Sequence, residues 1–440
     1  MSISPSTTIR CQSLLKQWRD SLSLSGLEND QFQKELKVLD NQLKRFQNKQ
    51  LQIVVFGRVG VGKSSLLNAL SEEHLFPTDI THGCTKEEKS LIWKKSFKKL
   101  RCVELIDTPG IDEINAKSRS DLAFKAALKS DLILFVLDGD LSEVEEDALV
   151  SLVNNGKHVV LVMNRCDQWQ SNDLSEVIRS IKNRLHSQDK VLKIELVAAS
   201  PRYPQINSNG IVRSEASSPK IDSFRSSLTR LIEDQGELLL SLNTLRQADN
   251  FYELLKKERL RRHRSSAQAL IGKFAAIKAS GVAANPLLLM DLATGMACDT
   301  ALIMQLSKIY GFELRGNSAR RLLKRLSIYN VTLGGAQMTI QIFLGVLKHI
   351  LFMTSPFTAG LSLAPAAPIA LAQAALAIHT TKLTGRLAAK ELLRGSQKIG
   401  SQPRLLLRRL AKYDPKAKVL LVNWSPSSFK GTTKLNTLLP

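Results

Sequence analysis

The sequence predicts an α/β domain with a mainly parallel sheet, preceded by helices and followed by an all-α region. Apolar runs of strand length alternate with helical patterns from residue 51 onward, which is typical of a parallel sheet covered by helices on both faces. A phosphate-binding loop motif lies between the first apolar strand pattern and a helical pattern. After about residue 280, long apolar stretches with few charges predict the all-α part.

The phosphate-binding loop has the spacing G-x-x-x-x-G-K-S. Its glycines let backbone N–H groups turn toward an anion, and the start of the next helix adds partial positive charge. Lys63 is expected to reach the β- and γ-phosphates, and the Ser64 hydroxyl to hold Mg²⁺. The predicted loop residues are Gly57, Arg58, Val59, Gly60, Val61, Gly62, Lys63, Ser64 and Ser65.

A second motif follows the strand pattern at 101–106, and further strands are expected at 91–93, 132–137, 158–163 and 192–198. Ligands of such sheets bind at the carboxyl ends of the strands. Asp107, the first residue of D-T-P-G, is expected to hold Mg²⁺ through water, and Gly110 to offer its N–H to the γ-phosphate. Thr85 is the preferred threonine to complete the Mg²⁺ shell, with Thr81 as the competing choice.

Two more motifs predict a guanine site. In Asn164-Arg165-Cys166-Asp167, the carboxylate of Asp167 can accept both N1–H and a 2-amino hydrogen of guanine, which adenine does not offer. A backbone N–H of the Ala198-Ala199 loop is expected to contact the guanine O6. The cofactors expected are therefore GTP or GDP with Mg²⁺.

On these motifs, residues 51–235 resemble the Era/TrmE-like bacterial GTPases of the P-loop class. Three positions depart from the family pattern: Gly60 replaces an Asn, Arg165 a Lys, and Ala198 the leading Ser of the last motif. Ile111 stands where Ras-like proteins have a catalytic Gln. The resemblance implies slow GTP hydrolysis with the water positioned by another group or a partner, so the catalytic residue is unknown.

Charge is unevenly distributed along the chain. The net charge is +22, and residues 246–440 hold 29 Lys+Arg against 8 Asp+Glu, so nearly all of it lies in the C-terminal part. We expect a polyanionic partner there, either an anionic membrane surface or RNA.

The segments 327–347 and 358–381 are each close to the ~20 residues that span a bilayer, and basic residues flank the pair. They predict either a two-span hairpin or two buried helices, and membrane association of some kind is the favoured interpretation. Residues 265–400 also resemble a helical domain of unknown function that some bacterial and chloroplast GTPases carry. That resemblance implies membrane association.

The predicted organisation has five parts: an N-terminal helical segment (1–50) broken at Ser25-Gly26, the G domain (51–236), a basic helical linker (237–278), an apolar helical domain (279–413) and a basic, poorly ordered tail (414–440). Within the G domain, 201–221 is expected to be a loop or insertion. Asp291 and Asp299 are interpreted as capping or ion-pairing residues rather than metal ligands.

The five cysteines are scattered without C-x-x-C spacing, and the N-terminus lacks a secretory pattern. A cytoplasmic or organelle-internal location is expected, with membrane association through the C-terminal half. The predicted function is a GTP-dependent switch with slow hydrolysis, coupled to a membrane-associated helical domain; an RNA- or ribosome-associated GTPase is the alternative. An unidentified protein partner, or dimerisation of the G domain, is expected to stimulate hydrolysis.

Overall fold

The computed structural model describes residues 6–22, 24–73, 76, 89–112, 117–185, 193–206, 212–284, 288–310, 319–324, 343–344, 346–347, 350, 366–395 and 403–421. The chain divides into two compact units. The first comprises Met1–Phe251 and Gly400–Phe429, and the second comprises Tyr252–Ile399 and Lys430–Pro440.

A six-stranded sheet with the order β2-β3-β1-β4-β5-β6 forms the centre of the first unit. Only β2 and β3 pair antiparallel, so the prediction of a mainly parallel sheet is confirmed. β4 and β5 are buried along their whole length, which is why they read as continuous apolar runs. The strands are β1 (Gln50–Phe56), β2 (Lys89–Trp93), β3 (Cys102–Asp107), β4 (Leu132–Leu137), β5 (Val159–Met163) and β6 (Ile194–Leu196).

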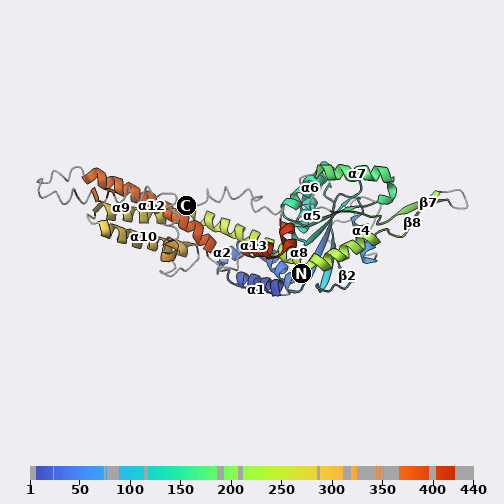
Figure 1. Ribbon diagram of the computed structural model, residues 1–440, viewed down its shortest axis with the longest axis horizontal. Coiled ribbons are helices and arrows are strands. Elements are labelled where there is room, and N and C mark those ends of the chain that lie inside the picture. The colour runs from blue at the N-terminus through green and yellow to red at the C-terminus, as the bar shows by residue number, and fades with distance from the viewer. Residues whose placement is uncertain are drawn as a thin grey trace. The chain divides into compact units, whose positions relative to one another are not determined.

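Helices cover both faces of this sheet. On one face, α5 (Lys117–Lys129), α6 (Glu143–Asn154) and α7 (Ser171–Arg184) pack apolar side chains against β1, β4 and β5 (Figure 1). On the other face lie α4 (Lys63–Ser71) and the first turns of α8 (Asp222–Arg262), where Arg225 Nη2 donates to the Ala69 carbonyl at 2.7 Å.

The N-terminal segment forms α1 (Ser6–Asp20), α2 (Gly26–Gln31) and α3 (Gln33–Gln47). The predicted break at Ser25 is confirmed, because Ser25 caps α2. Its hydroxyl accepts from Glu28 N at 3.3 Å, and its own N–H donates to the Glu28 carboxylate at 3.0 Å. This reciprocal pair is a capping box.

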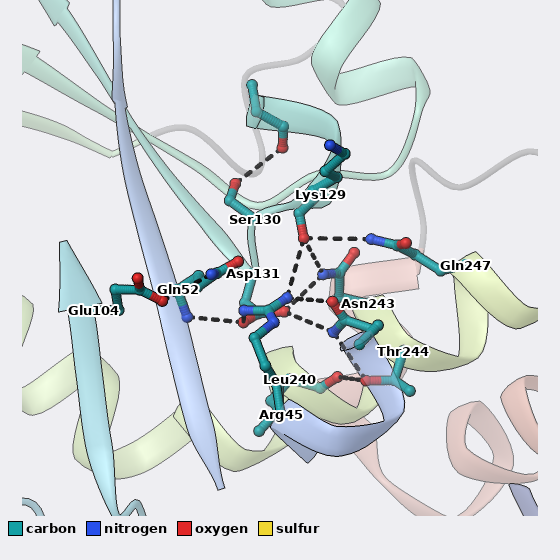
Figure 2. Close-up of polar contacts among 12 residues, drawn as sticks. Arg45, Gln52, Glu104, Lys129, Ser130, Asp131, Leu240, Asn243, Thr244 and Gln247 are labelled. Carbon is teal, nitrogen blue, oxygen red and sulfur yellow. Dashed lines mark hydrogen bonds and ion pairs between the residues drawn. The ribbon is translucent and has the colours of Figure 1, made fainter. Parts of the chain in front are cut away.

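A buried polar cluster joins α3 and α8 to the sheet (Figure 2). Its centre is Asp131, just before β4, whose side chain is fully buried. One carboxylate oxygen accepts from Arg45 Nη1 at 3.0 Å and from Gln52 N at 2.9 Å. The other accepts from Asn243 Nδ2 at 2.6 Å and Gln42 Nε2 at 3.3 Å. The cluster lies at the amino ends of β1 and β4, the edge opposite the phosphate loop.

The predicted boundary between the G domain and the helical linker, at 236, falls inside a helix, because α8 runs unbroken from Asp222 to Arg262. Gly236 stays helical with Leu100 packed close to it; a Cβ there would lie 2.9 Å from Leu100 Cδ1. The stretch 201–221, expected to be a loop or insertion, contains an antiparallel ribbon of β7 (Arg202–Ile206) with β8 (Val212–Ala216).

The second unit is helical in its described part. α12 (Ala366–Gly395) packs along α9 (Arg264–Ala284), and α10 (Leu288–Ile309) contacts both. Its core contains Ile271, Phe274, Leu302, Leu306 and Leu392. Lys278 Nζ lies 2.7 Å from Asp299 Oδ2, so the expected ion pairing of this aspartate is confirmed. The side chain of Asp291 lies outside the described residues.

Across the described part of the chain, no helix is both long and apolar enough to span a bilayer. This finding does not support the membrane insertion expected for the C-terminal domain. Most of the predicted span 327–347 lies outside the described residues, and the described part of 358–381, residues 366–381, belongs to α12.

The chain returns to the first unit through α13 (Pro403–Tyr413) and α14 (Pro415–Leu421). α13 contacts α1. Arg246 of α8 donates through Nη2 to the Leu420 carbonyl at 3.1 Å and also hydrogen-bonds the Gly156 carbonyl. Residues from the predicted helical domain and from the predicted tail thus pack on the same unit as the sheet.

Candidate nucleotide site

The phosphate loop connects β1 to α4 at the carboxyl edge of the sheet, with glycine required at its close contacts. Gly62, the residue preceding α4, has a φ of 89° and packs against the Asn164 amide. Gly110 packs on Val59 so closely that a Cβ there would lie 2.7 Å from Val59 N. Both positions therefore exclude a larger side chain.

The amine of Lys63 is directed into the loop. Nζ donates to the Gly57 carbonyl at 3.0 Å and to the Arg58 carbonyl at 2.6 Å, and the residue is only 7% exposed. A phosphate bound in the loop would offer anionic oxygens to the same amine. Because hydrogen bonds between charged partners are the stronger kind, Lys63 is suited to that exchange.

A hydroxyl and a carboxylate meet directly beside Lys63. Ser64 Oγ donates to Asp107 Oδ2 at 2.6 Å, and Asp107 is fully buried at the end of β3. Both are oxygen ligands of the kind that Mg²⁺ prefers, so the pair fits the predicted metal position. Thr85 and its competitor Thr81 lie outside the described residues.

Asn164 links the phosphate loop to the predicted guanine loop. Its Nδ2 donates to the Val61 carbonyl at 2.9 Å, and its Oδ1 accepts from Ala199 N at 3.0 Å. Asn164 is 2% exposed, so both hydrogen bonds are shielded from water. One side chain thereby fixes two loops that are far apart in sequence.

Arg165 also contacts the phosphate loop. It adopts a φ of 57°, and Nη2 donates to the Gly60 carbonyl at 2.5 Å. The guanidinium, which replaces the usual lysine, thus reaches the backbone of the phosphate loop.

Asp167 is half-buried in the short helix that follows Arg165. Across the loop, Lys220 Nζ lies 5.5 Å from the centre of the Tyr203 ring. Hydrogen bonding to Tyr203 is the main cause that raises the pKa of Lys220, and the Asp167 carboxylate contributes to the same rise. The ribbon strand β7 thus lies near the predicted base-recognising carboxylate.

The predicted amide donors to the guanine O6 already have acceptors in this structure. Ala198 N donates to the Lys220 carbonyl at 3.2 Å, and Ala199 N donates to Asn164. The O6 contact therefore stays a prediction, and Ser200 provides the next amide along the loop.

Sequence reasoning missed a charged group beside the loop. Arg58 Nε lies 3.1 Å from Glu145 Oε1, and Arg58 Nη2 lies 3.3 Å from Asp138 Oδ1. Arg165 Nη1 pairs with the other Asp138 oxygen, also at 3.3 Å. The position of Asp138, directly after the buried strand β4, was the available signal, since the other site motifs also follow strands. These carboxylates direct both arginines and brace the loop.

Ile111 is buried in the apolar core beneath α5, and its N–H donates to the Gly57 carbonyl at 3.4 Å. Its side chain cannot hydrogen-bond a water molecule. The structure therefore offers no equivalent of the Ras-type glutamine at this position.

Residues 52–165 match the family described as "50S ribosome-binding GTPase". Over these residues the α/β domain is similar to a GTPase domain. Residues 246–413 match a second family, described as a "domain of unknown function" (DUF697). The resemblances expected from the motifs are confirmed for both regions.

Curated relatives include GTPase Der of Buchnera aphidicola, 30% identical over 159 residues, which are 34% of each chain. GTPase Der of Synechocystis is 34% identical over 27% of each chain. The mitochondrial tRNA modification GTPase MSS1 of Saccharomyces cerevisiae is 29% identical over 33% of this chain and 28% of that protein. The chain thus spans about a third of the length of the relatives that it matches.

Among solved structures, Aquifex aeolicus Era bound to GDP·AlF4⁻ is 22% identical, over 34% of this chain and 52% of Era, with a TM-score of 0.31. Toc33 of Arabidopsis thaliana is 16% identical, over 46% of this chain and 92% of Toc33, with a TM-score of 0.30.

Proposed function

We propose that the protein binds GTP with Mg²⁺, hydrolyses it slowly and acts as a molecular switch. The observation that carries the proposal is the convergence at one edge of the sheet of Lys63, the Ser64–Asp107 pair and the Asn164 bridge. In this proposal, a phosphate site, a metal position and a base-recognition loop lie next to one another at that edge.

Each group has a distinct role in this proposal. The loop amides and Lys63 bind the phosphates, and Ser64 and Asp107 would hold Mg²⁺, which neutralises charge on the phosphate oxygens when bound. Asp167 accepts two hydrogen bonds from guanine and so rejects adenine. Arg165 contacts the phosphate loop at Gly60.

Hydrolysis is slow because Ile111 is part of the core and leaves the water without a positioning side chain. We infer that a protein partner or a second G domain supplies that group. Loss of the γ-phosphate would release Gly110 and Thr85, so that both loops relax and change what the helical region presents.

As the output of the switch, we propose that the basic C-terminal half binds a polyanionic partner. A specific observation favours a second candidate function, an RNA- or ribosome-associated GTPase: residues 246–440 carry a net charge of +21. The matching family is described as ribosome-binding, and one relative is named for tRNA modification. An anionic membrane surface is the competing partner. Flotation with anionic and neutral liposomes, beside RNA retention at physiological salt, separates the two.

The four cysteines that the structure describes are free thiols, which agrees with the proposed cytoplasmic or organelle-internal location.

The nucleotide proposal is tested with Asp167→Asn in the full chain. An amide presents a donor where the carboxylate accepted from guanine, so GTP affinity should fall by at least about tenfold and XTP affinity should rise. Competition against fluorescent GDP measures both. Asp173→Asn, an exposed aspartate at the start of α7, is the matched control. Unchanged GTP affinity in Asp167→Asn would remove this residue from the base site.

A further inference from the structure

The turn between β2 and β3 is strongly basic, although the N-terminal 245 residues together have a net charge of only +1. Over residues 94–101, Lys-Lys-Ser-Phe-Lys-Lys-Leu-Arg, there are five cations and no acidic residue. All five cationic residues are exposed: Lys94, Lys95, Lys98, Lys99 and Arg101. We refer to residues 94–101 as the basic turn.

The basic turn is anchored by buried apolar side chains. Phe97 packs edge-on against the buried Trp93 of β2, with ring centres 5.6 Å apart. Leu100 packs against α8 at Gly236. The Arg101 N–H donates to the Lys49 carbonyl at 3.0 Å, which ties the end of the turn to β1. The cations therefore project from a fixed backbone rather than from a loop without tertiary contacts.

Two of the five cations have partners on the protein. Lys94 pairs with Glu73, and Lys95 Nζ donates to Thr229 Oγ1 at 3.0 Å while lying 6.0 Å from the Trp93 ring centre. No ion pair of Lys98, Lys99 or Arg101 is recorded within the described residues. Holding like charges close together costs electrostatic energy, which an anionic partner with closely spaced charges would offset.

The basic turn lies at the edge of the sheet opposite the nucleotide site. β2 runs antiparallel to β3, pairing Lys89 with Asp107 at the site end and Trp93 with Val103 at the other. A partner bound at the turn would not obstruct the phosphate loop. β2 spans the sheet from the edge with the basic turn to the edge with the nucleotide site. The basic turn is therefore one strand length away from Asp107, the proposed metal-binding carboxylate.

We propose that the basic turn binds the phosphate backbone of RNA, with Lys98, Lys99 and Arg101 as the principal contacts. Lys and Arg side chains bind nucleic-acid phosphates by neutralising their charge, and three exposed cations without a recorded carboxylate partner in the described residues are suited to that role. The turn presents no exposed apolar side chain, because Phe97 and Leu100 are buried, whereas surfaces that enter a membrane interface combine cations with exposed apolar groups. Ile92 on β2 is the exposed apolar residue nearest in sequence.

The proposal is separate from GTP hydrolysis, and it extends the RNA-associated candidate to a surface outside the C-terminal half. The test uses the full-length chain and the charge reversal Lys98→Glu/Lys99→Glu. The control reversal, Lys34→Glu/Lys37→Glu, changes two exposed lysines of α3 in the same unit. Fluorescence anisotropy follows the binding of a labelled single-stranded RNA and of an RNA hairpin across a salt series.

The turn variant should lose at least about tenfold in RNA affinity near physiological salt. Its plot of log affinity against log salt should be shallower by about 1.4 to 1.8, because each phosphate contact contributes roughly 0.7 to 0.9 to that slope. The control variant should match the wild type. Binding of fluorescent GDP should be unchanged in both variants, which shows that they fold.

Wild-type RNA affinity and slope in the turn variant would overturn the proposal, as would failure of the wild-type chain to bind either RNA. A parallel arm uses phosphatidylserine-containing and neutral vesicles. If the turn variant lost vesicle binding and kept RNA binding, the surface would be a membrane contact and the RNA assignment would be wrong. Failure of the wild-type chain to bind GDP, by contrast, would contradict the proposed nucleotide function. The RNA-binding result could still be interpreted.

Discussion

Asn164 is the residue on which the candidate site depends most directly, because its side chain hydrogen-bonds two loops at once. Asn164→Ala removes both buried hydrogen bonds, to the Val61 carbonyl and from Ala199 N. Loss of buried hydrogen bonds costs about 1–3 kcal/mol, so nucleotide affinity should fall by about 5- to 150-fold.

Stopped-flow release of fluorescent GDP measures the change, which should appear as faster dissociation. Asn155→Ala is the control, since the exposed Asn155 amide donates to the Ser151 carbonyl within its own helix. An unchanged dissociation rate in Asn164→Ala would show that the two loops hold their positions without this bridge.

Lys157 makes stability depend on pH. Burial lowers its pKa to about 7, the Asp131 carboxylate acts in the opposite direction, and Arg246 and Arg45 lower the pKa further. The unfolded chain holds the proton up to a pKa of about 10.4. Between these values the unfolded state binds more protons, so the free energy of unfolding should rise as pH increases from about 7 toward 10.

Lys157→Met should remove most of that rise, and urea midpoints at several pH values between neutral and alkaline would show it. Burial lowers the pKa of the neighbouring His158 to about 4, so this imidazole does not titrate in the same window. Parallel pH dependence in wild type and variant would mean that Lys157 is solvated in the folded protein.

At the scale of elements, the Asp131 cluster holds α3, β1 and α8 together (Figure 2). Asp131→Asn leaves the largely buried Arg45 without its carboxylate. Breaking a buried ion pair by removing one partner costs about 3–5 kcal/mol, and we expect a loss of stability in that range, measured by urea unfolding.

Asp147→Asn, at an exposed position of α6, should change stability by less than about 0.5 kcal/mol. Because the cluster lies at the edge of the sheet opposite the phosphate loop, GDP affinity of folded Asp131→Asn should equal that of the wild type. Wild-type stability of this variant would contradict a structural role for the cluster.

Local patterns were sufficient for the elements whose signal is contained in a short stretch. The apolar run at 132–137 predicted β4, and the spacing of Gly57 to Ser64 predicted the phosphate loop. Local patterns failed where a contact between residues far apart in the sequence determines the structure. The predicted boundary at 236 falls inside α8, where Leu100 packs against Gly236, and the Asp131 cluster joins residues 89 and 112 positions apart. Asp138 carries no motif of its own, so only the fold places it beside Arg58.

At the scale of the whole molecule, segments that follow one another in the sequence do not all belong to the same unit. Residues 403–421 follow the helical unit in the chain but pack with the sheet-containing unit. A truncation after residue 236, the predicted domain boundary, would cut α8 and remove Asn243 and Arg246 from their partners. We expect it to be insoluble or unstable.

Replacing 252–402 with a flexible linker should instead give a folded protein that binds fluorescent GDP, because it keeps α8 to Phe251 together with α13 and α14. Thermal unfolding and GDP affinity compare the two designs. A stable, nucleotide-binding 1–236 fragment would show that the returning helices are dispensable.

The return of the chain to Arg246 also changes how the helical unit is tethered. A unit attached by a single linker can rotate about that linker without moving the unit to which it is attached. Residues 252–399 are joined to the first unit at both ends, through α8 and again before α13. A movement of this segment would therefore be transmitted through two covalent connections rather than one.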